Sequence, residues 1–389
     1  HDPVLPGLAR LLDSGAAAEI LSRHTDRNVT SASVRYIRYK PNTNAVVDYD
    51  VETNTGVHRA VLMIAADRNL AKRAGAAANQ SVADRARDRV PSTTPLGYDE
   101  RTAALVQWLP VDLWLPALAE PPAELAHHAG LAVAGDEAGG LLAYKPRRRA
   151  VVRVDGHVLK LYPSEALFRS AARALLASTR LPVPTPAPAG ICARWRVTAQ
   201  SVLEGAALGD GVARARDVGA VLADLHRAAL PDWRRRLDPL AGAMASAGTL
   251  AHLVPAAAPR LQRLVARLVA DAPPPGDVLC HGDFHAAQLL VTPDGLAVLD
   301  LDELGRGAPA IDVATYAAHL LDGTGTDDVL DETVDGLLAG YGTMPADLAW
   351  HLSVALLRRA VFPFRKDLTS DWPERVVNMI GAAEGAIAR

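Results

Sequence analysis

The chain has 389 residues, of which 49% are hydrophobic, and a formal net charge of −3. This length suits two or three domains, and the composition provides enough apolar surface for a large core. The nearly balanced charge argues against a dedicated nucleic-acid or membrane-surface binder, because such a protein usually carries a concentrated basic face.

The cysteines and the hydropathy pattern bear on the cellular compartment. Cys192 and Cys280 lie far apart and lack the spacing of a metal site, so a disulfide framework is not expected. No apolar stretch reaches the length of a membrane span. The N-terminus has no basic segment followed by an apolar one, so no secretion signal is expected. These features predict a cytoplasmic protein.

The first strong pattern along the chain is a hairpin that occurs twice. Tyr39-Lys40-Pro41 is followed, after three residues, by Ala45-Val46-Val47. Tyr144-Lys145-Pro146 is followed in the same way by Ala150-Val151-Val152. Each copy has the composition of a strand, a Pro-containing turn and a β-branched second strand.

The elements after each hairpin repeat as well. Another apolar strand follows at Ala60–Ala65 and at His157–Leu161, and then come an Ala/Arg-rich helix, a Pro-rich lead-in and a last apolar strand. This order covers roughly residues 31–115 and again 140–208, which predicts an internal duplication. Chance similarity of two Ala/Val-rich segments is the alternative.

From Gly209 onward the pattern changes to long amphipathic helices, interrupted by one strand-rich patch near 278–303. An α/β lobe followed by a mainly helical lobe is the bilobal plan of kinases. We therefore expect an α+β, protein-kinase-like fold with an extra, duplicated α/β lobe at the N-terminus. The expected domains are a front cap at 1–138, a second α/β lobe at 139–206 and a helical lobe at 207–389.

The strand-rich patch carries the most informative motif. It contains His281-Gly282-Asp283, then Gln288, then an apolar strand that leads to Asp300. Together with Gly307–Ala314, this pattern resembles the catalytic core of the aminoglycoside phosphotransferase and choline kinase superfamily. In such enzymes one carboxylate faces the acceptor, and a hairpin returns a second carboxylate to the same place. The resemblance implies a kinase that uses Mg²⁺ and either ATP or GTP.

The resemblance gives three of these residues expected roles. Asp283 would be the catalytic base that orients the acceptor hydroxyl, and an Asp that merely caps a turn is the alternative. Asp300 would bind Mg²⁺, which offsets the cost of a carboxylate beside a buried strand, and a structural salt bridge is the alternative. Gln288 stands where the superfamily more often has Asn. Its amide oxygen can still reach a metal, and a damaged metal site is the alternative.

Gln at this position is also similar to the maltokinase and glucosamine-kinase branch, which favours a sugar-type acceptor. Asp302 and Glu303 are further candidates for contacts to substrate or to a second metal. Along a strand Asp302 would share a face with Asp300, and an exposed turn is the alternative. His281 is expected to hold the loop by hydrogen bonds, whereas His285 could do this or take part in chemistry.

Nucleotide binding is expected in the second α/β lobe. Lys160 matches the family's strand lysine, and a buried ammonium needs a partner such as the α- and β-phosphates. Gln200, Val202 and Leu203 resemble the hinge segment whose backbone contacts the nucleobase. The corresponding front strand, Val61–Ile64, has no lysine, so the front lobe is expected to serve as a cap or brace.

Two features depart from the family pattern. The helix glutamate that pairs with the strand lysine would fall near Ser170, and Glu165 is the only carboxylate in that helix. The turn Arg147–Arg149 replaces a glycine-rich phosphate loop, and its arginines would lie either over the phosphates or in solvent.

The expected function is therefore phosphorylation of a hydroxyl on a small acceptor, such as a sugar, an amino sugar or an aminoglycoside-type antibiotic. A catalytically inactive nucleotide-binding module is the main alternative, and a protein or lipid kinase is a third. The sequence does not indicate an oligomeric state.

Overall fold

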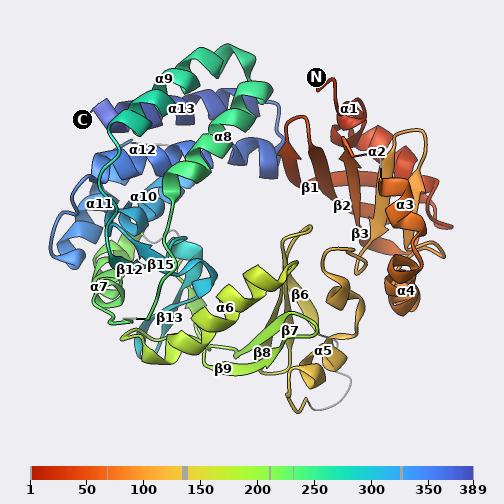
Figure 1. Cartoon of the computed structure of the whole chain (residues 1–389), viewed down its shortest axis with the longest axis horizontal. Coiled ribbons are helices and arrows are strands. Elements are labelled where there is room, and N and C mark those ends of the chain that lie inside the picture. The colour runs from red at the N-terminus through yellow and green to blue at the C-terminus, as the bar shows by residue number, and fades with distance from the viewer. Residues whose placement is uncertain are drawn as a thin grey trace. The chain divides into compact units, whose positions relative to one another are not determined.

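The computed structural model describes residues 2–67, 69–133, 139–209, 212–230, 232–324 and 327–388, with the backbone alone for 212, 322–324, 327–331 and 367. These residues form two compact units (Figure 1). Unit 1 comprises His1–Arg169, Ala189–Gln200 and Phe362–Trp372. Unit 2 comprises Ser170–Pro188, Ser201–Val361 and Pro373–Arg389. Among the described residues, no helix has the length and apolar character needed to cross a bilayer.

Unit 1 contains two five-stranded sheets whose strands follow the same order. The front sheet has the order β1-β2-β3-β5-β4, and the second sheet has the order β6-β7-β8-β10-β9. The strands are β1 (Val29–Lys40), β2 (Asn44–Thr53), β3 (Gly56–Ala65), β4 (Leu96–Asp99), β5 (Ala104–Trp108), β6 (Gly140–Lys145), β7 (Arg149–Val154), β8 (His157–Leu161), β9 (Pro188–Cys192) and β10 (Val197–Ser201). The identical order confirms the predicted duplication.

Helices join the third and fourth strands of each copy. These are α3 (Leu70–Gly75) and α4 (Ala77–Ala86) in the front copy and α6 (Glu165–Ala177) in the second. The other helical segments in or next to this unit are α1 (Leu8–Leu12), α2 (Ser14–Ser22), η1 (Arg87–Arg89), η2 (Pro116–Ala119), α5 (Pro122–His128), η3 (Ser178–Arg180) and η8 (Pro363–Asp367).

One hydrophobic core serves both sheets of unit 1. Val46 and Met63 contribute to it from the front sheet, and Val152 and Leu159 contribute from the second. Burial of these side chains removes apolar surface from water, which is the main stabilising contribution to such a fold. The two copies therefore stabilise each other.

An aspartate holds the hairpin turn of the front copy. Asp2 Oδ2 accepts hydrogen bonds from the Tyr39 hydroxyl at 2.8 Å and from the Asn42 N–H at 2.9 Å. Burial would raise the pKa of Asp2, but the hydrogen bonds that its carboxylate accepts keep this pKa below its usual value.

The second copy has the same anchor. Asp112 Oδ2 accepts hydrogen bonds from the Tyr144 hydroxyl at 2.8 Å and from the Arg147 N–H at 2.9 Å. Asn42 and Arg147 also share a positive φ, of 54° and 61°. Both aspartates open an Asp-x-x-Leu-Pro sequence. The duplication therefore begins at Asp2 and Asp112, earlier in each copy than the predicted starts near residues 31 and 140.

The strand register shows what replaces the lysine in the front sheet. Met63 pairs with Val46 across β2 and β3, and Lys160 pairs with Val151 across β7 and β8. Val46 and Val151 lie at the same distance after their Tyr-Lys-Pro turns. Met63 therefore occupies the position in the front copy that Lys160 occupies in the second.

Met63→Ala tests the structural role of the front lobe. Met63 is buried in the shared core, so the substitution should lower the free energy of unfolding by about 2–5 kcal/mol in a denaturant titration. The KM for the nucleotide should stay close to that of the wild type. Met344→Ala is the control, because Met344 is 72% exposed and its loss should leave stability unchanged. A large rise in the nucleotide KM for Met63→Ala would mean that the lobes are assigned the wrong way round.

Unit 2 is mainly helical and carries two small antiparallel sheets, β11-β13-β14 and β12-β15. Its strands are β11 (Ala206–Ala207), β12 (Val278–Cys280), β13 (Leu289–Thr292), β14 (Gly295–Val298) and β15 (Gly305–Gly307). Its helices are η4 (Val212–Arg214), α7 (Ala215–His226), α8 (Pro239–Leu253), η5 (Pro255–Ala257), α9 (Ala258–Ala270), η6 (Ala286–Gln288), η7 (Leu301–Glu303), α10 (Ala310–Thr324), α11 (Asp327–Tyr341), α12 (Leu348–Arg359) and α13 (Trp372–Ala388).

The core of unit 2 places the motif-bearing loops on a rigid support. Val218 and Leu222 of α7 and Tyr316 of α10 pack in one cluster with Phe284 of the loop after β12 and Val298 of β14. Apolar residues at helical spacing on α7 supply its buried face. The well-packed core of unit 2 therefore supports the β13–β14 hairpin and the loop after β12.

Candidate active site

The His-Gly-Asp loop follows β12, which pairs with β15. Gly282 has a φ of +85°, and a Cβ at this position would lie 2.7 Å from the carbonyl oxygen of Glu303. A side chain would therefore meet both backbone strain and a clash, which explains why glycine stands between His281 and Asp283.

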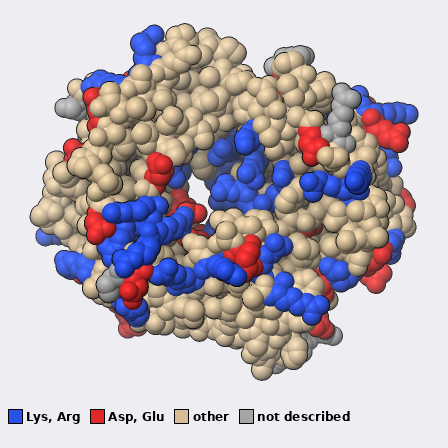
Figure 2. All heavy atoms as spheres, in the orientation of Figure 1, with Lys and Arg blue, Asp and Glu red and all other residues tan. Residues whose placement is uncertain are grey.

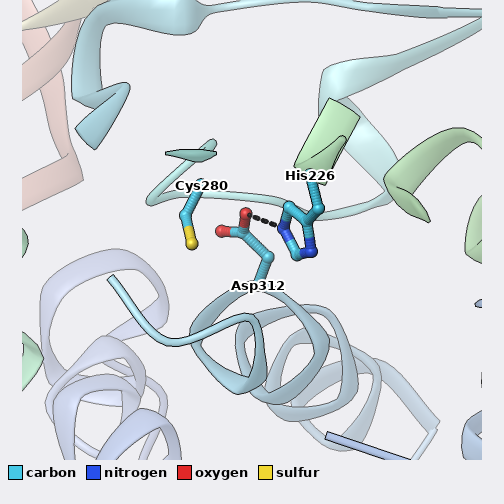
Figure 3. Close-up of side chains that lie close together, drawn as sticks. All are labelled: His226, Cys280 and Asp312. Atoms are coloured by element: carbon cyan, nitrogen blue, oxygen red, sulfur yellow. Dashed lines mark hydrogen bonds and ion pairs between the residues drawn. The ribbon is translucent and has the colours of Figure 1, made fainter. Parts of the chain in front are cut away.

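A buried carboxylate holds this loop. Asp312, in the first turn of α10, accepts the N–H of His281 at 2.6 Å and the N–H of Gly282 at 2.8 Å. Its carboxylate also lies 3.0 Å from Nε2 of His226, at the end of α7 (Figure 3). Burial would raise the pKa of Asp312, but the hydrogen bond and charge of His226 and the bound N–H groups keep it below its usual value. Asp312 is thus an ionised anchor for the loop.

Cys280 lies beside this pair in Figure 3. Possible ligand atoms of Cys280, His226 and Asp312 all lie within 4.8 Å of one another. Burial raises the pKa of the Cys280 thiol well above its usual value, which disfavours the thiolate that metals bind. The thiol donates instead toward the carbonyl oxygen of Ala308, at 3.4 Å. We interpret the trio as a structural brace.

The substitution Asp312→Asn should destabilise both the His-Gly-Asp loop and the whole fold. The amide has one acceptor oxygen where the carboxylate serves three donors, so a buried N–H loses its partner. The free energy of unfolding should fall by about 1–3 kcal/mol, and kcat should fall with it. Urea titration and initial rates measure the two effects. Asp224→Asn, an exposed substitution on α7, should change neither quantity by much, because its surface ion pair with Arg227 contributes little. Wild-type stability and rate in Asp312→Asn would contradict the anchoring role.

His281 joins the loop to the β13–β14 hairpin. Its Nε2 lies 2.8 Å from the carbonyl oxygen of Leu299, and its Nδ1 accepts the N–H of Asp283 at 3.3 Å. The first contact requires a proton on Nε2, and the second requires a free lone pair on Nδ1, so the ring is the neutral Nε2–H tautomer. This bridge links the backbone of Asp283 to the residue that precedes Asp300, as the expected scaffolding role of His281 requires.

Phe284 is the buried residue of the loop and lies between Asp283 and His285 in the sequence. Its ring is buried between His281 and Tyr316, with centroid distances of 5.7 and 5.9 Å. The neighbouring side chains of Asp283 and His285 are only partly buried. Phe284 therefore anchors the loop in the core and leaves its two neighbours available for chemistry.

Asp283 lies in a cluster that includes two histidines. Ligand atoms of Asp283, His285 and His319 lie within 4.8 Å of one another. The two imidazole rings stack with centroids 3.9 Å apart and planes 9° apart. Nη1 of Arg359, on α12, lies 2.5 Å from Nε2 of His319. The sequence analysis did not identify His319 or Arg359, because they come from helices distant in sequence and belong to no motif.

His285 is neutral over the physiological pH range. Burial lowers the pKa of His285 to about 4, and the charge of Arg359 acts in the same direction, whereas the charges of Asp283 and Asp300 oppose it. The contacts of His285 agree with this, because its ligand atom lies within 4.8 Å of that of Asp283 and the Gln288 amide lies between His285 and Asp300. A neutral imidazole can accept or donate one hydrogen bond next to Asp283.

The low pKa of His285 predicts how stability depends on pH. Between about pH 6.5 and 4, the unfolded chain binds a proton at His285 that the folded protein does not bind. Stability should therefore fall as the pH decreases through this window. In His285→Gln this contribution disappears. The slope of the unfolding free energy against pH should therefore decrease, by an amount that corresponds to at most one bound proton. Equal slopes in denaturant titrations of the two proteins would contradict a buried neutral imidazole.

Gln288 and Asp300 meet at the open end of the β13–β14 hairpin. The Leu299 N–H donates to the Gln288 carbonyl oxygen at 2.8 Å and so extends the pairing of Leu289 with Val298. The Gln288 side-chain amide lies 3.5 Å from Asp300 Oδ2 and 3.3 Å from Nε2 of His285. Asp300 has a φ of 56° and a ψ of 59°, a left-handed conformation that turns the chain after the strand.

This donor set fits a magnesium ion. Mg²⁺ prefers oxygen ligands and is usually held by one or two protein carboxylates with waters and substrate phosphates. Asp300 supplies a carboxylate, and a half-turn of the Gln288 amide exchanges its nitrogen and oxygen, which would point a second oxygen toward Asp300. The residues present are therefore compatible with the predicted metal.

Asp302 does not share a strand face with Asp300, and of the two alternatives in the sequence analysis the structure favours the turn. The left-handed turn at Asp300 ends the extended chain, and Leu301–Glu303 forms the short helix η7. Arg235 Nη1 donates to the Asp302 carbonyl oxygen at 2.7 Å, and the Arg235 guanidinium forms an ion pair with Glu303. Glu303 is exposed and committed to this pair, which makes it the weaker of the two substrate candidates.

The predicted nucleotide residues lie on the second sheet and directly after it. Lys160 is buried on β8, Gln200 lies on β10, and Val202 and Leu203 follow that strand. The only carboxylate of α6, Glu165, forms an exposed ion pair with Arg169 at 2.7 Å, within the same helix. Glu165 is thus engaged away from the strand lysine.

The turn between β6 and β7 does not leave Arg147 in solvent. The Arg147 guanidinium lies over the Trp114 ring, with Cζ 3.9 Å from the ring centroid. Its backbone N–H is held by Asp112, as described above. Both contacts fix this turn against the segment that precedes the second copy.

Comparison with known proteins assigns the chain to a family. The sequence profile described as "Phosphotransferase enzyme family" matches residues 141–352, which is more than half of the chain. No curated protein sequence matches the chain significantly. Among solved structures, amicoumacin kinase hAmiN is similar with a TM-score of 0.50 at 12% identity, over 67% of this chain and 92% of that chain.

Two further solved structures are similar at lower scores. Aminoglycoside phosphotransferase APH(3'')-Id from Streptomyces rimosus is 20% identical over 61% of this chain and 96% of its own, with a TM-score of 0.44. Ethanolamine kinase from Plasmodium vivax is 12% identical over 82% of this chain and 96% of its own, with a TM-score of 0.49.

The likeness to amicoumacin kinase, together with the mixed sheets and helices described above, confirms the predicted protein-kinase-like fold. The family profile covers the second sheet as well as the loops that carry Asp283 and Asp300. The chain therefore belongs to the phosphotransferase enzyme family and is a small-molecule kinase.

Proposed function

We propose that the protein transfers the terminal phosphoryl group of ATP or GTP to a hydroxyl of a small, sugar-like acceptor. Asp283 acts as the base that orients this hydroxyl and accepts its proton. Gln288 and Asp300 would hold the metal, and Lys160 would contact the nucleotide phosphates. Mg²⁺, when bound, screens the negative charge of the triphosphate. Gln200, Val202 and Leu203 would contact the nucleobase through their backbone.

One observation carries the proposal. Asp283 and Asp300 come from different loops, yet both lie near His285. Ligand atoms of Asp283 and His285 lie within 4.8 Å of one another, and the Gln288 amide contacts both His285 and Asp300. The His281 bridge and the Asp312 anchor explain how those loops are kept together. Phosphoryl transfer depends mainly on positioning and charge stabilisation, and a fixed pair of carboxylates of this kind serves both requirements.

The surroundings of Asp283 favour one kind of acceptor. The groups beside it are the neutral ring of His285, the ring of His319 and the guanidinium of Arg359. A guanidinium next to His319 disfavours an ammonium group that approaches Asp283 from the same side. We therefore propose a hydroxyl of a neutral sugar, as in the maltokinase side of the branch named above, over an acceptor with ammonium groups next to the reacting oxygen. Asp302 is the remaining candidate for a contact to that sugar.

A screen of acceptors tests this function. The protein is incubated with Mg²⁺, ATP or GTP, and panels of neutral sugars, amino sugars and aminoglycosides, and products are detected by the mass gained with one phosphoryl group. We expect a product from the neutral sugars and none when Mg²⁺ is chelated. Nucleotide binding without a product from any panel would instead favour a catalytically inactive nucleotide-binding module. A product only from aminoglycosides would contradict the acceptor class.

A further inference from the structure

Unit 1 gathers five arginines around the front sheet. Arg38 lies on β1, Arg73 on α3, Arg147 and Arg148 in the β6–β7 turn, and Arg365 on η8. We call these residues the arginine cluster. Figure 2 shows basic side chains gathered in the middle of its view, where Figure 1 places β1 and the β6–β7 turn.

The register places Arg38 on the same face of the front sheet as Met63. Arg38 pairs with Val46, and Val46 pairs with Met63, so these three residues form one row across β1, β2 and β3. Nη1 of Arg147 lies 3.6 Å from Sδ of Met63 and so reaches the same row from the β6–β7 turn. Arg147 therefore contacts the position that corresponds to Lys160 in the second copy, and Arg38 lies in the same row of residues.

The members of the cluster repel one another. Burial lowers the pKa of Arg38, and the charges of Arg148 and Arg365 lower it further. Burial likewise lowers the pKa of Arg147 to about 10, with the charges of Arg38 and Arg73 acting in the same direction and that of Asp112 opposing them. Like charges brought together in a partly buried region destabilise the protein unless an anion compensates them.

Among the described residues, the cluster lacks the acidic partners that other arginines of unit 1 have. Arg23 pairs with Asp99, Arg35 with Asp50, and Arg59 with Asp48. Across the described part of the chain, by contrast, no carboxylate forms an ion pair with any member of the cluster.

Two donors of the cluster are also buried without an acceptor. Nε of Arg147 and Nε of Arg365 are shielded from solvent and find no hydrogen-bond partner within the described ranges. A buried donor left in this state is unfavourable, so such a site favours a ligand that brings acceptor oxygens. Guanidinium groups bind phosphate oxygens especially well, because their planar fork can donate two parallel hydrogen bonds.

We propose that the arginine cluster is a binding site for a small anion that carries several phosphate groups. The site lies beside Met63, where the second copy has Lys160, so the duplicated front lobe retains a phosphate site in which arginines replace the strand lysine. The comparison with Lys160 rests on the proposed function, whereas the geometry and charge of the cluster do not depend on it.

Titration calorimetry with inorganic tripolyphosphate tests this site in the full-length chain. The Lys160→Ala background and a metal-free buffer suppress binding at the proposed nucleotide site. We expect saturable binding of one tripolyphosphate per chain. Arg38→Gln and Arg365→Gln should each weaken this binding by about tenfold or more, because each removes a charge-assisted hydrogen bond.

Two further variants distinguish a loss of binding from a loss of folding and from a general loss of positive charge. Arg148 is exposed, so Arg148→Gln should weaken binding without any effect on folding, even if a more buried substitution destabilises the protein. Arg153→Gln on β7 removes an exposed arginine outside the cluster and should leave the Kd unchanged. Absence of binding in the Lys160→Ala background, or equal affinity in the cluster variants and the Arg153→Gln control, would overturn the proposal. Loss of catalysis in Lys160→Ala tests the proposed function separately.

Discussion

Replacing Asp283 by asparagine is expected to lower kcat by about 10²–10⁴-fold, which is the usual contribution of a positioned general base. Asparagine keeps the size and planarity of the side chain but cannot accept the proton of the acceptor hydroxyl. The loop should keep its shape, because Asp312 and His281 hold it through its backbone. Nucleotide affinity should therefore stay near that of the wild type while turnover is lost.

Steady-state rates, thermal unfolding and nucleotide titration together check this expectation for Asp283. Asp294→Asn is a matched control, because Asp294 is exposed in the tight turn of the β13–β14 hairpin and should tolerate the change with its rate intact. If Asp283→Asn turned over at the wild-type rate, another group would have to be the base. A large drop in thermal stability would instead assign Asp283 a structural role.

Local patterns in the sequence predicted much of this architecture. Each Tyr-Lys-Pro turn lies between strands that are close in the chain, so spacing alone identified both hairpins and the duplication. The His-Gly-Asp loop and the hairpin that leads to Asp300 are also contiguous. Their physical requirements, a glycine with positive φ and a short return strand, are visible in the sequence itself.

Contacts between distant segments could not be predicted in this way. His226 and Asp312 are 86 residues apart, and no spacing rule joins the end of one helix to the start of another. The Asp2 and Asp112 anchors did leave a signal, since both begin an Asp-x-x-Leu-Pro sequence. That signal lies well upstream of the hairpins, and its meaning depends on hydrogen bonds that only the folded chain reveals.

The sequence left the chain direction after Asp300 open between a continued strand and a turn. A strand continued through Asp300 would place Asp302 on the same face, but the backbone turns into the left-handed region instead. Asp and Asn adopt this conformation more readily than most residues, so the sequence permitted the turn without requiring it. The Gln288 amide lies beside the Asp300 carboxylate, and Asp302 lies in the short helix that follows the turn.

Asp300→Asn is expected to reduce turnover by roughly 10³-fold or more, because a neutral amide is a much weaker ligand for Mg²⁺ than a carboxylate. The fold should be unaffected, since asparagine tolerates the left-handed backbone at this position at least as well as aspartate does. Asp300→Ala should lose turnover to the same extent but should also be less stable by about 1–2 kcal/mol, because alanine disfavours a positive φ.

The comparison of these two variants separates the chemistry of Asp300 from its backbone strain. Rates measured over a range of Mg²⁺ concentrations should show a higher half-saturating concentration in both variants, whereas only the alanine variant should unfold at lower denaturant. Chelation of the metal should bring the wild type down to the rate of Asp300→Asn. Unimpaired turnover in Asp300→Asn would place the metal elsewhere. An unchanged metal requirement combined with lost turnover would indicate that Asp300 acts on the acceptor rather than on the metal.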